Sequence, residues 1–246
     1  MTISKLTLAA ALAAGFLTAA PALAQDEPSD GITVTGGATL VSEYRFRGVS
    51  FSDKDPTIQG TINLTHDSGF YVGTWASGLA GFGSFGGSNT EVDVYGGYSK
   101  EISGVTVDVG LLWYLYPGTD GTDYAEPYAS IKGSLGPVTA KLGVAYAPDQ
   151  SAIGSDDNLY VFTDVSSAIP NSPITLKAHY GYSDGSLAGP NGSYTDWLIG
   201  ADITWKALTL GVAYVDTSIS KGDDFVMDPT RKIAQSAVVV SLGASF

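Results

Sequence analysis

Two arginines stand close together in an acidic chain, at a spacing that suits ion selection. The stretch YRFRG places Arg45 and Arg47 two residues apart, and Glu43 lies two residues before Arg45. The chain has only 12 Lys and Arg against 25 Asp and Glu. In an extended strand, residues two apart point to the same face, so these three charges share one face. Charged side chains that line a pore select ions, and this is the chemistry that the spacing indicates.

The same two arginines allow other interpretations, which stay open at the level of sequence. They could simply neutralise carboxylates on the same wall. An arginine could instead reach outward to a lipopolysaccharide phosphate through bidentate hydrogen bonds. The strand parity disfavours this third interpretation, because it turns Arg45 and Arg47 away from the outer face.

Charged residues of both signs recur at the inward parity of the later segments. Such a mixture fits either a field across a narrow channel or a lumen closed by salt bridges. Asp93, Lys141, Asp164 and Asp196 share the inward parity. We expect the pore-lining residues to be Glu43, Arg45, Arg47, Asp108, Glu126, Lys132, Lys177, His179 and Asp202.

Catalysis and metal binding have little support in the sequence. The chain lacks cysteine and has only two histidines, His66 and His179, on which a Ser-His-Asp arrangement could be built. His66 falls in an expected turn, and we interpret His179 as a polar wall residue. The acidic connections lack the D-x-[DN]-x-[DN]-G spacing of a calcium loop. We therefore expect no enzyme, no catalytic residue, no metal site and no cofactor, although divalent cations bridging these loops to lipopolysaccharide stay open.

The elements that must position these side chains are short strands. From Gly31 onward, segments of about ten residues alternate apolar and polar residues and are separated by turn residues, which is typical of β-strands. The chain is 44% hydrophobic and 15% charged, with 31 Gly. The pattern predicts strands near 31–47, 56–65, 70–78, 91–101, 104–115, 124–134, 137–147, 158–167, 174–183, 194–205, 208–217 and 234–246.

The connections between these segments alternate in length, short after long, along the whole chain. An outer-membrane barrel follows this rule, since its periplasmic turns are short and its extracellular loops long. The sequence therefore predicts an all-β fold, a transmembrane antiparallel up-and-down barrel of about 12 strands. Residues 25–246 would form this single domain.

Aromatic residues on the outward parity are expected at the two membrane–water interfaces. Trp197 and Trp205 are eight residues apart on one face, which in a tilted strand spans roughly 20 Å along the membrane normal. Tyr44 and Phe46 continue the outward face of the first segment. We expect these four side chains to anchor the barrel in the membrane.

Both ends of the sequence carry signals of export and insertion. Residues 1–24 combine Lys5, an apolar run and the small-x-small site Ala22-Leu23-Ala24, which predicts a signal peptide cleaved after Ala24. Phe246 closes an alternating apolar segment and resembles the C-terminal signal that the barrel-insertion machinery reads. Ala244 departs from the aromatic residue often found two positions before the end.

Two stretches resemble a known family. LVSEYRFRGVSFSDKDPTIQG (residues 40–60) and SGFYVGTWAS (residues 68–77) are similar to the TorF-type porins, a family of hypothetical bacterial outer-membrane proteins. The resemblance covers about forty residues, and the rest of the chain agrees only in the succession of its expected strands. It implies an outer-membrane barrel and a pore, and it supplies no substrate and no catalytic residue.

These observations lead to one expected function and one alternative. We expect a narrow outer-membrane porin that passively conducts ions or small polar solutes. The alternative is a closed structural or surface-recognition barrel whose loops bind lipopolysaccharide or a partner. The expected partners are outer-membrane lipid and lipopolysaccharide, the insertion machinery, small solutes or ions, and other copies of the chain in a homo-oligomer. No nucleic acid is expected.

Overall fold

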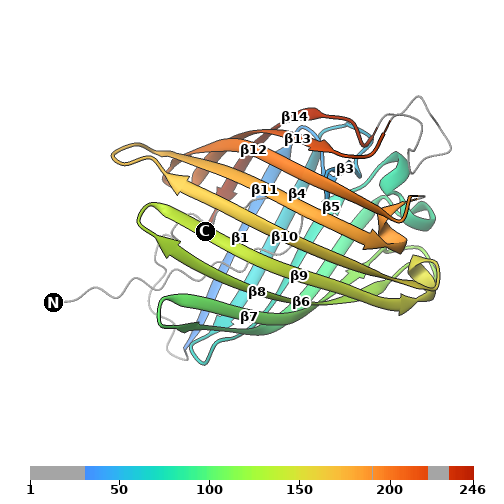
Figure 1. Cartoon of the computed structure of the whole chain (residues 1–246), viewed down its shortest axis with the longest axis horizontal. Helices are drawn as coiled ribbons and strands as arrows, with labels where there is room; N and C mark the ends of the chain where they lie inside the picture. The colour runs from blue at the N-terminus through green and yellow to red at the C-terminus, as the bar shows by residue number, and fades with distance from the viewer. Residues whose placement is uncertain (1–30, 190, 221–232) are drawn as a thin grey trace.

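The computed structural model describes residues 31–189, 191–220 and 233–246. Its barrel strands are β1 (Ile32–Val41), β4 (Thr57–His66), β5 (Phe70–Gly78), β6 (Thr90–Ile102), β7 (Val105–Leu115), β8 (Tyr124–Leu135), β9 (Val138–Gln150), β10 (Asp156–Ala168), β11 (Ile174–Gly185), β12 (Ser193–Trp205), β13 (Leu208–Thr217) and β14 (Ala237–Ser245). Within the described residues, these twelve strands form a closed antiparallel barrel (Figure 1). Each strand pairs with its neighbours in the chain, and β1 pairs with β14. The predicted fold class is confirmed.

The alternation of side chains decides which face of each strand turns outward. On β12, Ile199, Ile203 and Trp205 are 61%, 46% and 65% exposed, whereas Asp196 and Asp202 on the other parity are almost fully buried. Successive residues of a strand point to opposite faces, so one face is apolar and the other polar. The barrel is thus inverted relative to a water-soluble protein, with its apolar face outside.

The two ends of the barrel differ in their connections. Short turns gather at one end, here called the turn end, and longer connections at the other, the loop end (Figure 1). The expected alternation has one exception. The loop-end connection at 151–155 is no longer than the turn at 169–173, because β9 continues to Gln150 and β10 already begins at Asp156.

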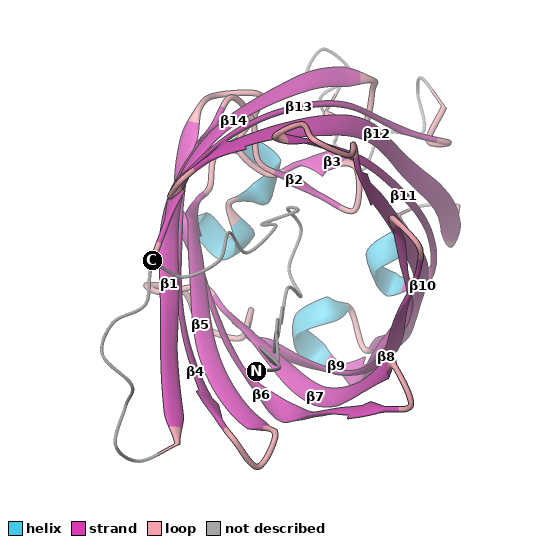
Figure 2. Ribbon diagram, turned by 90° about the vertical axis from the view of Figure 1, so that its left-hand side faces the viewer, coloured by secondary structure: helices cyan, strands magenta, loops and turns pink. Residues whose placement is uncertain are grey.

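The first strand ends earlier than the sequence pattern indicated. After Val41 the chain leaves the wall and forms a hairpin of β2 (Arg45–Phe46) and β3 (Val49–Ser50) inside the ring of strands (Figure 2). Arg47 and Gly48 have φ angles of 46° and 83° and make the two-residue turn. Positive φ at both central residues is the geometry of a tight hairpin turn and cannot continue a strand.

This early ending overturns one prediction. Tyr44 and Phe46 were expected at the membrane–water interface on the outer face of the barrel. They are only 1% and 7% exposed and lie inside the barrel, because the chain has already turned inward before it reaches them. The alternation of a wall strand does not apply to Tyr44 and Phe46, because these residues are no longer in the wall.

Other predicted surface residues keep their outward position. Trp205 is exposed, and Trp197 is half-buried with its ring 5.2 Å from that of Tyr214. Phe246 is exposed, and its backbone exchanges hydrogen bonds of 2.9 and 3.0 Å with Gly36 of β1. A membrane-anchoring role for the tryptophans and an insertion signal at Phe246 stay predictions.

The seam between the first and last wall strands is short. Gly37–Val41 of β1 pair with Ser241–Ser245 of β14, whereas the β1–β4 pairing extends over the whole of both strands. Backbone hydrogen bonds of Gly36 with Phe246 and of Ser42 with Val240 continue the seam at its two ends, but it remains shorter than the pairing on the other side of β1.

Helical structure is limited to short 3-10 turns in the described residues. These are η1 (Gly81–Gly83), η2 (Phe85–Gly87), η3 (Ser151–Ile153) and η4 (Ser186–Ala188), all in loop-end connections. None of the helices in the described part of the chain has the length and apolar character needed to cross a membrane. The expected signal peptide, residues 1–24, lies outside the described residues.

Candidate functional site

The β2–β3 hairpin lies inside the barrel at the loop end, and its tip touches the wall at β12 and β13 (Figure 2). At its tip, a Cβ atom on Gly48 would lie 2.5 Å from Thr217 Cγ2 and 2.9 Å from Asp196 Cβ, so only glycine fits there. Tyr194 of β12 donates its hydroxyl to the carbonyl oxygen of Arg47 at 3.0 Å. The hairpin is therefore held at its tip as well as at its base, and it narrows the lumen.

Arg47 fastens the hairpin to the wall on the side of β8. Its Nη2 donates to both carboxylate oxygens of Glu126, at 2.6 and 2.7 Å, and Tyr114 donates its hydroxyl to the same carboxylate at 3.0 Å. The guanidinium carbon lies 4.7 Å from the ring centre of Phe46 and 4.1 Å from that of Tyr160. A buried cation thus gains both an ion pair and two aromatic faces.

Arg45 secures the base of the hairpin. Its Nη2 donates to Glu43 at 2.9 Å, and its Nη1 donates to the carbonyl oxygens of Gly48 and Gln235 at 2.7 and 2.8 Å. Arg45 and Arg47 are both buried inside the barrel and paired with carboxylates. This supports the interpretation that they neutralise carboxylates. Their position is incompatible with contact to an outward lipopolysaccharide phosphate.

Tyr44 joins the hairpin to the wall on the opposite side, at β5 and β6. Its hydroxyl donates to Glu91 Oε1 at 2.8 Å, and Tyr116 donates to Oε2 of the same carboxylate at 3.2 Å. Burial raises the pKa of Tyr44 well above its ordinary value, and the neighbouring Glu91 charge adds to the rise. The hydroxyl therefore keeps its proton and remains a donor. The Tyr44 ring also meets Trp75 edge-on, with centroids 5.2 Å apart.

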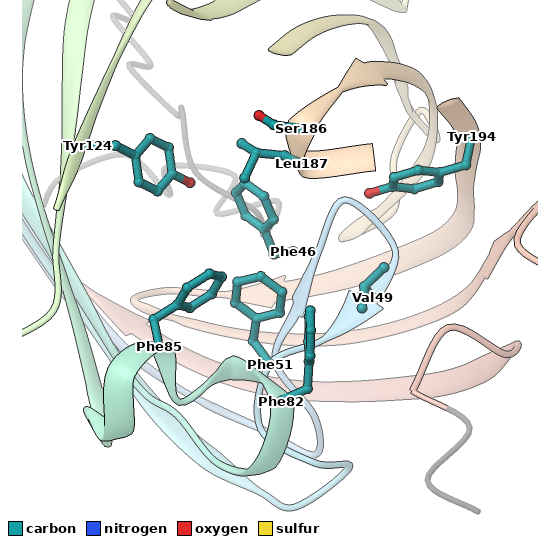
Figure 3. A pocket seen from close by; sticks show the side chains of 9 residues that line it. All are labelled: Phe46, Val49, Phe51, Phe82, Phe85, Tyr124, Ser186, Leu187 and Tyr194. Carbon is teal, nitrogen blue, oxygen red and sulfur yellow. The ribbon is translucent and has the colours of Figure 1, made fainter. Parts of the chain in front are cut away.

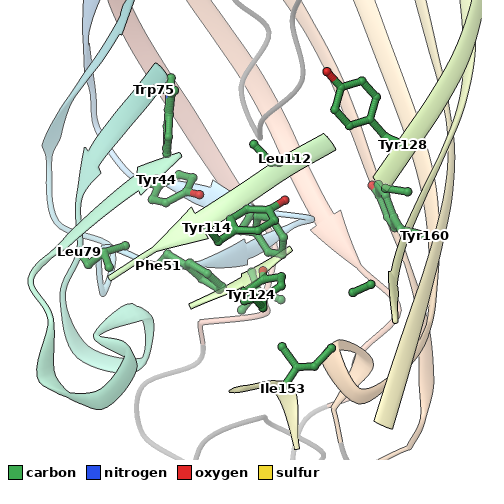
Figure 4. Packing of buried hydrophobic residues seen from close by; sticks show 14 of the residues in the cluster. Tyr44, Phe51, Trp75, Leu79, Leu112, Tyr114, Tyr124, Tyr128, Ile153 and Tyr160 are labelled. Carbon is green, nitrogen blue, oxygen red and sulfur yellow. The ribbon is translucent and has the colours of Figure 1, made fainter. Parts of the chain in front are cut away.

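Aromatic side chains fill much of the space around the hairpin (Figure 4). Phe51 lies 5.1 Å from Phe46, 5.7 Å from Tyr44 and 5.6 Å from Phe85 between ring centres. Sequence reasoning missed this cluster because it assigned aromatic residues to the outer surface. A usable signal was present: Tyr114 has the same strand parity as the inward Asp108.

One glycine permits the close contact between η1 and the hairpin. A Cβ atom at Gly83 would overlap the carbonyl oxygen of Phe51, so Gly83→Ala must separate the two backbones. We expect this substitution to lower the free energy of unfolding by about 1–3 kcal/mol, as measured by denaturant unfolding of the refolded barrel. Gly60→Ala is the control, since its Cβ would have no neighbour nearer than 3.9 Å. Equal effects of both substitutions would contradict the contact.

Deeper in the barrel, His179 lies between two carboxylates. Its Nδ1 is 2.6 Å from Asp164 Oδ1 on β10, and its Nε2 is 3.2 Å from Asp196 Oδ1 on β12. Tyr160 Oη lies 2.8 Å from Nε2 and donates to Asp196 Oδ2 at 3.0 Å. The network joins three neighbouring strands, and Arg47 above Tyr160 links it to the hairpin.

Towards the turn end, the inner wall carries further paired charges. Lys177 Nζ donates to Asp202 Oδ1 at 2.7 Å, and both residues are buried. Asp108 accepts a hydrogen bond of 2.7 Å from the Tyr71 hydroxyl. Lys132 on β8 lies directly opposite Lys141 on β9 in the strand register, so two positive charges are neighbours there.

The predicted pore-lining residues all lie on the hairpin or on inward positions of the wall. They fall into three groups along the barrel axis: the hairpin with Glu126, the His179 network, and the charges near the turn end. That they line an open pore stays a prediction. In the described part of the chain, no group of three or more His, Asp or Glu side chains has a geometry that could hold a metal ion.

Comparison with known proteins agrees with this fold. The sequence model of a family described as "Bacterial protein of unknown function (Gcw_chp)" matches residues 25–246. The structure is similar to that of the NanC porin, with a TM-score of 0.57 and 12% identity, over 87% of this chain and 99% of that one. The KdgM porin gives the same TM-score at 10% identity, over 86% and 99% of the two chains. Among curated proteins, no sequence matches significantly.

Proposed function

The chain belongs to the Gcw_chp family, and from its architecture we propose that it is an outer-membrane diffusion channel whose lumen is narrowed by the β2–β3 hairpin. The observation that carries this proposal is the inversion of the barrel wall. Large apolar side chains are exposed on the outer face, as Ile58, Leu242 and Trp113 illustrate, while the inner face holds carboxylates, lysines and arginines. Lipid requires the first arrangement, and a lumen that contains water permits the second.

The inner wall favours the passage of small ions or small polar solutes over that of large ones. Charges of both signs lie along it, and the hairpin occupies part of its cross-section at the loop end. Twelve strands give a lumen intermediate between the packed interior of eight-stranded barrels and the open channel of sixteen-stranded porins. The proposal includes export by a cleaved signal peptide and an insertion signal at Phe246. The resemblance to the TorF-type porins supports the same function.

Planar-bilayer recording tests the channel directly. The purified protein should produce discrete conductance steps whose size grows with salt concentration. A heat-denatured sample of the same preparation is the control. If the folded barrel inserts into the bilayer without any steps, the channel proposal fails, and the alternative of a closed recognition barrel takes its place.

The opposed lysines near the turn end should influence which ions pass. Replacing both Lys132 and Lys141 with Gln removes two neighbouring positive charges from the inner wall. We therefore expect the reversal potential in a salt gradient to shift toward cation selectivity. Lys206→Gln is the matched control, because Lys206 is exposed in the turn between β12 and β13, against Trp205. An unchanged reversal potential in the double variant would show that these charges do not face the conducting path.

A further inference from the structure

A small aromatic pocket lies at the loop end, against the β2–β3 hairpin (Figure 3). The hairpin contributes Phe46, and Phe51 follows it directly in the chain. The β5–β6 connection contributes Phe82 and Phe85, and the starts of β8 and β12 contribute Tyr124 and Tyr194. The cavity has a volume of about 110 Å³ and is only partly enclosed. Four chain segments that are distant in sequence thus build one apolar recess.

Two hydroxyl groups in the pocket wall have no hydrogen-bond partner among the described residues. Ser186 Oγ is buried and has no hydrogen-bond partner in the described part of the chain. Tyr124 stacks on Tyr114, with ring centres 4.4 Å apart, and its hydroxyl points into the pocket without a hydrogen bond to any described residue. Buried polar groups are nearly always hydrogen-bonded, so an unpartnered one calls for an explanation. A bound molecule that accepts or donates a hydrogen bond would provide it.

The chemistry of the wall restricts what can bind. Among the described residues, the pocket is lined by aromatic and aliphatic side chains and by Ser186, without a charged side chain, so a charged ligand would meet no counter-charge from them. A sugar would leave most of its hydroxyls unpartnered against Phe82, Phe85 and their neighbours. A dry apolar cavity of about 150 Å³ holds benzene, so a single ring is the appropriate size here.

We propose that this pocket binds a small neutral aromatic molecule with one polar substituent, such as a phenol. The ring would contact the faces and edges of Phe46, Phe51 and Phe85, which favour offset or edge-on packing of aromatic partners. The substituent would bond to Tyr124 or Ser186. The site does not depend on conduction, so binding can succeed where the channel proposal fails, and conduction can be found where binding is absent.

Fluorine NMR with 4-fluorophenol tests the proposal on the full-length purified protein in detergent. Phenol that partitions into the micelles gives a linear response, whereas occupancy of the pocket saturates and is displaced by unlabelled phenol. We expect saturable binding that weakens about fivefold in Tyr124→Phe, the loss of one hydrogen bond. Leu187→Trp, which fills the pocket, should abolish it. Tyr180→Phe is the matched control, since Tyr180 is 52% exposed on the outer face.

Each possible outcome either supports or overturns the proposed binding of a phenol. The proposal is overturned if the wild-type protein shows no saturable component, or if Leu187→Trp binds as well as wild type. Undiminished affinity in both Tyr124→Phe and Ser186→Ala would also overturn it, because the hydroxyls would then have no ligand. Cyclohexanol should compete at least tenfold more weakly than phenol, and equal competition would rule out an aromatic preference. Tyr124→Phe keeps the test valid if Leu187→Trp does not fold.

Discussion

Removal of the β2–β3 hairpin is expected to raise the single-channel conductance several-fold. Val41 and Thr57 are partners at the ends of β1 and β4, so the wall itself does not need residues 42–56. A two-residue Asn-Gly turn can join two antiparallel strands at this point. The shortened protein should keep its barrel while losing the segment that occupies part of the lumen.

The control for this deletion is a shortened turn at the other end of the barrel. Residues 169–173 connect β10 to β11, and replacing them with Asn-Gly leaves the hairpin in place. Conductance should then remain at the wild-type value. If the hairpin deletion folds and conducts no better than wild type, the narrowest part of the lumen lies elsewhere, and the proposed role of the hairpin is wrong.

Replacing Arg47 with Ala is expected to lower the free energy of unfolding by about 3–5 kcal/mol. The reason is Glu126, which is 2% exposed and would be left buried without the cation that lies 2.6 Å away. Tyr114 would still donate to the carboxylate, but a neutral hydroxyl does not replace the ion pair. Denaturant unfolding of the refolded protein, followed by tryptophan fluorescence, measures the loss.

A double-mutant cycle separates the ion pair from other effects of the substitution. Glu126→Gln removes the carboxylate charge, so Arg47→Ala should be much less damaging in that background. Arg47→Lys keeps the charge but loses the planar guanidinium that lies over the Phe46 and Tyr160 rings, and it should fall between wild type and Arg47→Ala. Strictly additive losses from Arg47→Ala and Glu126→Gln would contradict a direct pairing of these two residues.

Much of the wall could be predicted from sequence because its signal is repeated. Twelve alternating segments in series predicted the strand number and most boundaries, and the period placed Asp196 and Asp202 inward and Trp205 outward on β12. Each segment is weak evidence alone. Their regular succession makes a barrel a much better explanation than any soluble arrangement.

The hairpin could not be predicted from the same signal, because its alternation continues that of β1 without a break. Tyr44 and Phe46 have the outward parity of the strand that precedes them, and only the turn at Arg47–Gly48 reverses the chain. An isolated glycine inside a strand pattern signals an irregularity or a close approach of the backbone, and Gly48 in FRGV offered this signal. The partners of Arg47 lie on distant strands, so no local pattern reveals them.

The short seam between β1 and β14 affects how the barrel assembles and where it begins to open. A finished barrel has no free strand edge, but until the last pairing forms it has two, and here they are β1 and β14. Their partners are the most distant in sequence of all neighbouring strands, which makes their closure the slowest encounter. Because the β1–β14 pairing has fewer residue pairs than the β1–β4 pairing, it should also be the first to open. Backbone amides of Gly37–Val41 that face β14 should therefore exchange with deuterium sooner than those that face β4.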